Sequence, residues 1–337
     1  MTDHPRKILL TVPGHLKTVP MNRFVYETLV AMGHRVEVFD LSAGSLPQKI
    51  HKGIARKHFY ATLNRRLLSR VETFRPDLLF SVFGFDLFPE TLQKIREGGT
   101  PTACWWLNDP FQYRKSIRQA PYYDHYFTNA HATVEEYRRD GIEKVHYLPV
   151  GIFPSVHRKL PDVSKKYDIL FAGDYSELRE QIITELLKEF DVAVVGPWKK
   201  LSPSSPVNSA IVRRSFFTPE EMNRFFNEAR IVLNIHTWMN KSTHGINPRL
   251  FEACGSGSFQ LTDNKEDIAL LFGVGRELDT YETIEELKEK LRYYLSHEKE
   301  RERVAAAGYE RVLREHTYRR RMEQMLSTVF ETPRSRA

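Results

Sequence analysis

Residues 244–263 contain side chains of the types that bind a phosphate-bearing ligand. Asn247 is a favourable helix cap, Pro248 suits a first helical position, and two glycines followed by an apolar run predict a helix end and then a strand. A helix start exposes unpaired backbone N–H groups and a partial positive charge, so we expect it to face a diphosphate, with Arg249 adding a formal charge. An ordinary capped helix packed on a sheet would fit the same pattern.

Glu252 follows one turn further along the predicted helix. A carboxylate does not favour phosphate, so we expect it to accept hydrogen bonds from sugar hydroxyls, unless it is simply solvated. Asn234, His236 and Asn240 precede this segment and are further candidates for sugar contacts. They fit equally well as polar residues that end a strand.

The pattern Asn-x-Arg-x-Phe-Glu-Ala, followed by a glycine-containing turn and a strand, resembles the donor-site signature of GT-B glycosyltransferases. It is most similar to the group named after the spore maturation protein CgeB, through the whole second half and more weakly through the first. In the related Glu-x7-Glu transferases the second glutamate binds the donor ribose, a role that the resemblance gives to Glu252. His244 stands where their first glutamate would be, so the resemblance implies a sugar contact there and leaves the Glu-x7-Glu mechanism open.

Strand-like and helical segments alternate along the chain, and the alternation restarts after a proline-containing connector at 149–164. We therefore expect an α/β protein of GT-B type, with two Rossmann-like domains whose parallel sheets face a cleft. The expected domains are residues 1–152, on the acceptor side, and 153–337, on the donor side. Residues 45–74 read as a basic helix, and 283–330 as two helices, the last of which the resemblance allows to cross back to the first domain. The expected strands are 7–12, 35–39, 77–83, 102–107, 125–128, 145–149, 167–172, 192–195, 231–236 and 259–261.

The loops at the carboxyl ends of these strands should carry the chemistry. In the second half, Gly173 would let a ligand approach the backbone, and Arg179 and Lys199 are candidates to pair with phosphate. The resemblance supports a basic residue near the Gly173 loop and places the nucleobase near 213–217. There Phe217, or its neighbour Phe216, could stack on the base, although burial in the core is the more usual place of a phenylalanine.

In the first half, His15 follows the first strand and could take a proton from an acceptor hydroxyl at neutral pH. Asp109 ends another strand and is the rival base, or else a cap for the helix that follows. Some inverting GT-B enzymes use a histidine or an aspartate in this half, so the resemblance fits both candidates.

Composition sets limits on the function. The chain of 337 residues is 41% hydrophobic, enough for two cores, yet has no apolar run long enough to cross a membrane. The first residues lead directly into a strand without a signal peptide, and the two cysteines, Cys104 and Cys254, read as reduced thiols, so we expect a cytoplasmic protein. The net charge of +7 suits anionic ligands or peripheral membrane contact, and is also an ordinary solubility charge. Nucleic acid is not expected, because the Lys and Arg residues are dispersed.

The predicted function is transfer of a hexosyl or related sugar from a nucleotide-diphosphate donor, with a UDP-sugar favoured over a GDP-sugar, to an acceptor that the sequence does not identify. No bound cofactor is expected, and no metal, because the sequence contains neither Asp-x-Asp nor a His/Cys cluster with ligand spacing. The stereochemical course stays open. Two alternatives are a nucleotide-sugar epimerase and a non-catalytic protein that binds a nucleotide sugar or glycan.

Overall fold

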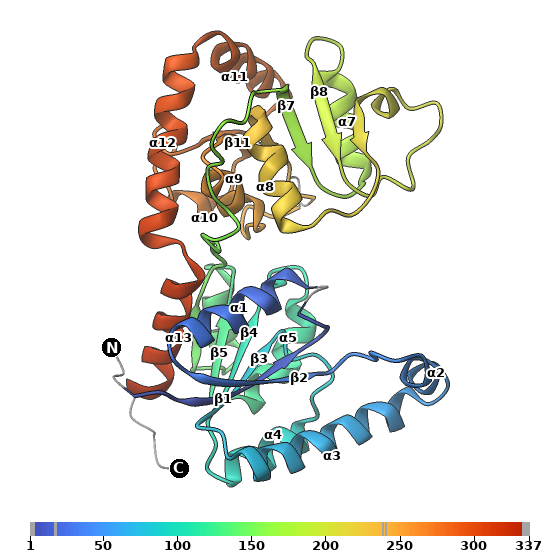
Figure 1. Cartoon of the computed structure of the whole chain (residues 1–337), viewed down its shortest axis with the longest axis vertical. Coiled ribbons are helices and arrows are strands. Elements are labelled where there is room, and N and C mark those ends of the chain that lie inside the picture. Colours follow the sequence, from blue (N-terminus) through green and yellow to red (C-terminus); the bar gives the residue numbers. More distant parts are fainter. Residues whose placement is uncertain (1–3, 17–18, 238, 240, 332–337) are drawn as a thin grey trace. The chain divides into compact units, whose positions relative to one another are not determined.

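The computed structural model in Figure 1 describes residues 4–16, 19–237, 239 and 241–331. The chain divides into two compact units, Met1–Val150 with Tyr318–Ala337 (unit 1) and Gly151–Thr317 (unit 2). The division falls two residues before the expected boundary at 152/153. By its contacts the last helix belongs to unit 1.

Unit 1 is built on a six-stranded sheet in the order β2-β1-β3-β4-β5-β6, in which all neighbouring strands are parallel. Apolar runs between loops form these strands because both faces of a parallel sheet are covered by helices. The expected strands of the first half are confirmed, with ends that differ by up to two residues. The strands are β1 (Lys7–Val12), β2 (Arg35–Asp40), β3 (Leu78–Val82), β4 (Thr102–Trp106), β5 (His125–Thr128) and β6 (Val145–Tyr147).

The segment expected as one helix at 45–74 forms two. The first is capped by Ser45 and the chain leaves helical geometry at Ala55, with φ −135° and ψ 59°. Gly53, a poor helix former, lies just before this break.

The last helix of the chain packs in unit 1. The ring of Tyr318, at the start of α13, lies 5.4 Å from that of Phe24 in α1. The helices of unit 1 are α1 (Pro20–Ala31), α2 (Leu46–Ile54), α3 (Arg56–Phe74), α4 (Pro89–Glu97), α5 (Tyr113–Gln119), α6 (Thr133–Arg139) and α13 (Tyr318–Glu331).

Unit 2 contains a second parallel six-stranded sheet, in the order β12-β11-β10-β7-β8-β9. The α/β class with two parallel sheets is thus confirmed. The short strands β9 and β12 were not expected from the sequence. The strands are β7 (Tyr167–Ala172), β8 (Val192–Val195), β9 (Ile211–Arg213), β10 (Ala229–Asn234), β11 (Phe259–Asp263) and β12 (Asp279–Tyr281).

The expectation of two helices at 283–330 is wrong, because the segment forms three. Non-helical residues at His297 and His316 separate them. The helices of unit 2 are α7 (Glu177–Leu186), α8 (Pro219–Glu228), α9 (Arg249–Gly255), α10 (Glu266–Ala269), α11 (Ile284–Ser296) and α12 (Glu298–Glu315). Within residues 4–331, leaving aside the undescribed positions, no helix combines the length and apolar character needed to span a bilayer.

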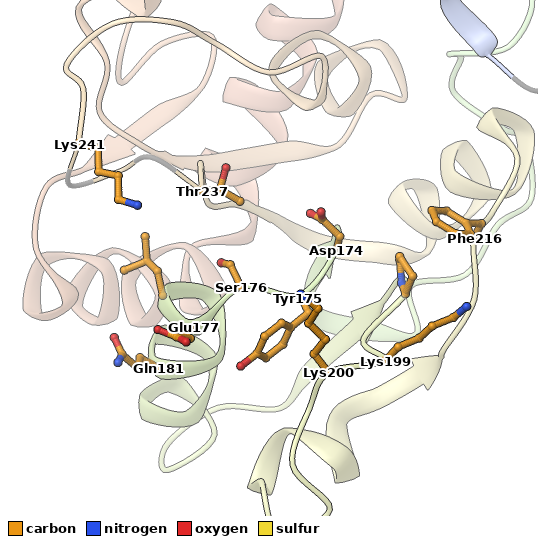
Figure 2. A pocket seen from close by; sticks show the side chains of 12 residues that line it. Asp174, Tyr175, Ser176, Glu177, Gln181, Lys199, Lys200, Phe216, Thr237 and Lys241 are labelled. Atoms are coloured by element: carbon orange, nitrogen blue, oxygen red, sulfur yellow. The ribbon is translucent and has the colours of Figure 1, made fainter. Parts of the chain in front are cut away.

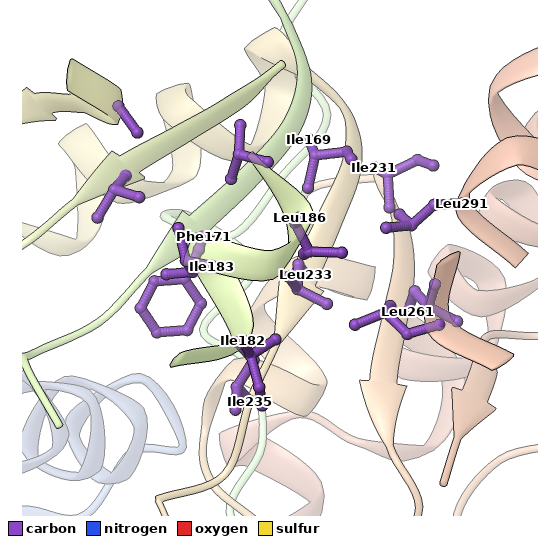
Figure 3. Packing of buried hydrophobic residues seen from close by; sticks show 14 of the residues in the cluster. Ile169, Phe171, Ile182, Ile183, Leu186, Ile231, Leu233, Ile235, Leu261 and Leu291 are labelled. Carbon is purple, nitrogen blue, oxygen red and sulfur yellow. The ribbon is translucent and has the colours of Figure 1, made fainter. Parts of the chain in front are cut away.

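Successive side chains of β7 enter different cores, as strand geometry requires. Ile169 and Phe171 pack with residues of α7 and α11 on one face (Figure 3), while Leu170 and Ala172 pack with residues of α8 and α9 on the other. This packing fixes the direction of β7, and so the place where the loop that follows it begins.

Candidate active site

The carboxyl ends of β7 and β10 lie where the sheet of unit 2 reverses its strand order. Ligands of such sheets bind beside this switch point. A cavity of about 880 Å³ lies there, lined by the loops after β7 and β8, the start of α7 and the segment after β10 (Figure 2). Its polar lining includes three lysines and two carboxylates. The lysines are Lys199, Lys200 and Lys241, and the carboxylates are Asp174 and Glu177.

The two candidate phenylalanines have different environments. Phe216 is 77% exposed and lines the cavity, so its ring is accessible to a planar ligand. Phe217 packs against the core on the α8 face, with the guanidinium carbon of Arg249 5.6 Å from its ring centroid. Of the two, Phe216 is therefore better placed to stack on a base.

Arg179 is buried and ties the two strand ends together. Its guanidinium donates to the carbonyl oxygen of Ile235, at 2.8 and 3.1 Å, and to both the carbonyl and the carboxylate of Asp174. Burial lowers the pKa of Arg179. These contacts use most of the N–H groups of Arg179. Arg179 therefore holds Asp174 in the cavity wall, and its geometry does not favour the expected direct pairing with phosphate.

Gly173 lies in crowded surroundings, where an added Cβ atom would lie 2.8 Å from the ring of Phe171. The carbonyl oxygen of Gly173 accepts a hydrogen bond of 3.0 Å from the indole N–H of Trp198. A Cβ atom on Gly196 would lie 1.9 Å from the same oxygen. The loops after β7 and β8 therefore touch through two glycines, next to Asp174 and Pro197 in the lining of the cavity.

The expectation that Asn247 caps α9 is wrong. The helix begins at Arg249, one residue later than expected, and no side chain caps it. The amide of Asn247 instead exchanges two hydrogen bonds with that of Asn234. When two side-chain amides pair, each uses both its N–H donor and its carbonyl acceptor, whereas an Asn side chain that caps a helix uses only its acceptor. Because α9 has only seven residues, its dipole contributes little to ligand binding.

His236 lies beneath this loop, fully buried, instead of reaching toward a sugar. Its Nδ1 lies 2.7 Å from a carboxylate oxygen of Asp263, and its Nε2 accepts the backbone N–H of Asn247 at 3.2 Å. These contacts assign the ring proton to Nδ1. Lys265 lies 3.3 Å from the other Asp263 oxygen and donates to the carbonyls of Met239 and Ser242. The network fixes the loop from both ends.

Arg249 and Glu252, the expected phosphate and ribose ligands, form an ion pair with each other. The Nε of Arg249 also lies 3.4 Å from the carbonyl oxygen of Ala172, so the guanidinium lies at the carboxyl end of β7. The other carboxylate oxygen of Glu252 lies 3.8 Å from Nε2 of His157, a buried residue of the connector. His157 was not among the predicted site residues, because nothing in the local pattern of the connector marks it.

The side chain of His244 is one-third exposed and turned toward α10. Its Nδ1 lies 3.4 Å from Glu266 and 3.9 Å from Asp267. The latter carboxylate also accepts the backbone N–H of Gly245. His244, which stands where the Glu-x7-Glu pattern would have its first glutamate, thus has two acidic neighbours. Asn240 lies outside the described residues.

Of the predicted donor-side residues, Lys199 lines the cavity directly. Arg179 binds Asp174 of the cavity lining, Gly173 immediately precedes Asp174, and the guanidinium of Arg249 lies at the carboxyl end of β7. In the described part of the chain, no three His, Cys, Asp or Glu side chains gather as a metal ion would require. Independence of metal stays a prediction.

The two candidate bases of unit 1 differ in accessibility. His15 is exposed in the loop after β1, as expected. Asp109 is buried, and hydroxyl groups donate to its carboxylate from Thr128 at 2.7 Å, Tyr137 at 2.9 Å and Ser116 at 3.2 Å. Burial raises the pKa of Asp109 to about 6. A catalytic base must reach its substrate, so this geometry favours His15.

Residues 176–327, from the start of α7 into α13, match a protein family described as glycosyl transferase-like. The two parallel sheets of the chain form the GT-B fold, and over residues 176–327 the chain is similar to glycosyl transferase-like proteins. Over 265 residues it is 26% identical to spore protein CgeB of Bacillus subtilis strain 168, covering 74% of this chain and 82% of CgeB. The resemblance to the CgeB group is thereby confirmed.

Solved structures show the same fold. Sucrose-phosphate synthase of Thermosynechococcus elongatus superposes with a TM-score of 0.72 at 10% identity, covering 97% of this chain and all (100%) of that one. A glycosyltransferase of Rickettsia africae ESF-5 gives 0.69 at 13% identity, covering 97% and 98% of the two chains. HepE of Anabaena, in complex with UDP and glucose, gives 0.65 at 13% identity, covering 96% and 100%.

Proposed function

We propose that this chain transfers a hexosyl group from a UDP-sugar, in preference to a GDP-sugar, to an acceptor hydroxyl without a metal ion. The observation that carries the proposal is the cavity at the switch point of unit 2, with its lysines Lys199, Lys200 and Lys241 and the exposed ring of Phe216. Ammonium groups suit a diphosphate and an aromatic face suits a base. The match of residues 176–327 supports the same function.

In the proposed reaction, the bond between the sugar's anomeric carbon and the diphosphate oxygen breaks as a bond to the acceptor oxygen forms. The cavity lysines and Arg249 stabilise the charge that develops on the leaving diphosphate. His15 takes the acceptor's proton if the reaction inverts. If the reaction retains configuration, the leaving phosphate takes that proton.

The test follows release of UDP from UDP-glucose, UDP-N-acetylglucosamine and UDP-galactose, with and without a panel of glycan acceptors. Release that depends on an acceptor supports transfer. Interconversion of the donor would assign an epimerase. Stabilisation of the protein by donor without any turnover would assign a non-catalytic binding protein, the alternative that His244 in place of glutamate favours.

The role of His15 is tested with His15→Ala. Loss of the base should lower kcat by about a hundredfold or more while leaving donor affinity unchanged. His297→Ala, which removes another exposed histidine, is the matched control. An unchanged kcat in His15→Ala would remove it from the mechanism.

A further inference from the structure

Helix α2 carries three large apolar side chains on one face, and all three are exposed. Leu46, Ile50 and Ile54 are spaced four residues apart and are 71%, 53% and 83% exposed. This spacing aligns them along one side of a helix. None of the nine residues of α2 is buried. The helix is attached to α3 by another side, where the ring of His51 lies 5.6 Å from that of Phe59.

The residues around this apolar stripe carry a concentrated positive charge. Residues 41–71 contain seven Lys and Arg and no Asp or Glu, while the chain as a whole has a net charge of +7. The other 43 basic residues therefore balance the 43 acidic ones, and this one segment carries the whole net charge. The seven residues are Lys49, Lys52, Arg56, Lys57, Arg65, Arg66 and Arg70.

Most of this charge is free to act on a partner. Arg56 pairs with Asp86 and Arg70 with Glu37. Lys49, Lys57 and the adjacent Arg65 and Arg66 are exposed. The net charge of +7 is thus localised in the segment that carries the apolar stripe.

We propose that α2 and the first half of α3, residues 46–66, form a docking surface for an anionic lipid bilayer. Apolar side chains on a surface helix enter the boundary between headgroups and acyl chains, and flanking basic residues are attracted by anionic headgroups. An apolar groove on another protein would explain the stripe but would not call for the six positive charges of residues 46–66. Figure 1 shows α2 at the outer end of α3, away from the strands of unit 1. The proposal does not depend on the proposed glycosyl transfer.

The test measures co-sedimentation of the full chain with vesicles of phosphatidylcholine mixed with phosphatidylglycerol, and with vesicles of phosphatidylcholine alone. We expect binding to the mixed vesicles, weakened by salt, and little binding to the neutral ones. The triple variant Leu46→Ser, Ile50→Ser, Ile54→Ser should bind mixed vesicles about tenfold more weakly or worse. Its matched control removes three scattered exposed side chains of unit 2, Val212→Ser, Leu270→Ser and Leu313→Ser, and should bind as the wild type does.

A charge variant tests the second half of the proposal. Lys49→Gln, Lys57→Gln and Arg65→Gln together should weaken binding to the mixed vesicles, whereas Lys94→Gln, Arg114→Gln and Lys115→Gln, exposed elsewhere in unit 1, should not. Equal binding to both kinds of vesicle, or full binding by the triple serine variant, would overturn the proposal. So would a dimer that the serine variant abolishes without any vesicle binding, because the stripe would then join two copies of the chain.

Discussion

The side-chain amides of Asn234 and Asn247 exchange two hydrogen bonds, one of 2.9 Å and one of 3.1 Å. Asn234 is the last residue of β10, and Asn247 lies just before α9. The pair therefore joins the two ends of the loop between them, and the buried contacts of His236 reinforce this closure. The loop that leads into the segment Asn247–Ala253 is therefore closed by polar contacts within the protein.

Asp263→Ala should destabilise the protein by about 3–5 kcal/mol, because it leaves the buried ammonium of Lys265 without its carboxylate. Urea unfolding gives this free energy. The double variant Asp263→Ala, Lys265→Met should recover part of the loss, since no unpaired charge remains. Equal stability of the single and double variants would show that the ion pair does not hold this loop.

Gly196→Ala should destabilise unit 2 by about 3 kcal/mol, because its Cβ would overlap the carbonyl oxygen of Gly173. Gly141 is the matched control, since it also has positive φ, of 85°, but has no atom within 4 Å of an added Cβ. Gly141→Ala should therefore cost only about 1 kcal/mol. Thermal unfolding of both variants measures the difference, and equal costs would contradict the close contact.

The stability of the protein should depend on pH through Asp109. The pKa of Asp109 is raised from 3.8 to about 6 in the folded state, mainly by burial. The contribution of Asp109 to the free energy of unfolding is therefore fully present below about pH 4 and is lost as the pH rises through 6. Two pKa units correspond to roughly 3 kcal/mol. The side chain of Asp109→Asn stays neutral at every pH. The stability of this variant relative to the wild type should therefore rise by about that much as the pH is raised from about 4 to 7.

Urea titrations at several pH values measure this gain, and Asp191→Asn, at an exposed carboxylate, controls for the removal of a charge. Parallel stability curves for the wild type and Asp109→Asn would show that the folded carboxylate is not destabilised by burial.

Arg249→Ala and Glu252→Ala should each weaken binding of UDP-glucose, the former by about 1.5–3 kcal/mol through loss of a charge-assisted contact. Because the two side chains pair in the unliganded protein, their effects should not add in the double variant. Calorimetric titration of UDP-glucose into the wild type, the two single variants and the double variant completes a double-mutant cycle. Unchanged affinity in both single variants would remove this pair from the donor site.

Much of the fold follows from the sequence, because a strand of a parallel sheet is a short apolar run between loops. Strands such as β1 and β7 begin and end where the pattern predicts. The break between α2 and α3 was missed, since both helices are rich in helix-forming residues and only Ala55 separates them. The third helix of the last segment was missed for the same reason.

The candidate site was predicted less completely, because residue types do not reveal partners. Arg249 and Glu252 are one turn apart, yet the helical pattern did not indicate that they would pair with each other. The contact of Glu252 with His157 joins distant parts of the sequence. Lys199 and Phe216 come together in the cavity only because β8 and β9 are neighbours in the sheet.

The cavity of unit 2 should bind a nucleoside diphosphate through its lysines. Calorimetric titration of UDP into the wild type and into the double variant Lys199→Gln, Lys200→Gln tests it most directly, with Lys188→Gln, Lys299→Gln as a control outside the cavity. We expect the cavity variant to bind UDP about tenfold more weakly or worse and with a smaller dependence on salt, while the control binds as the wild type does. Equal affinity of the cavity variant and the wild type, or no binding of UDP by any of them, would contradict the claim.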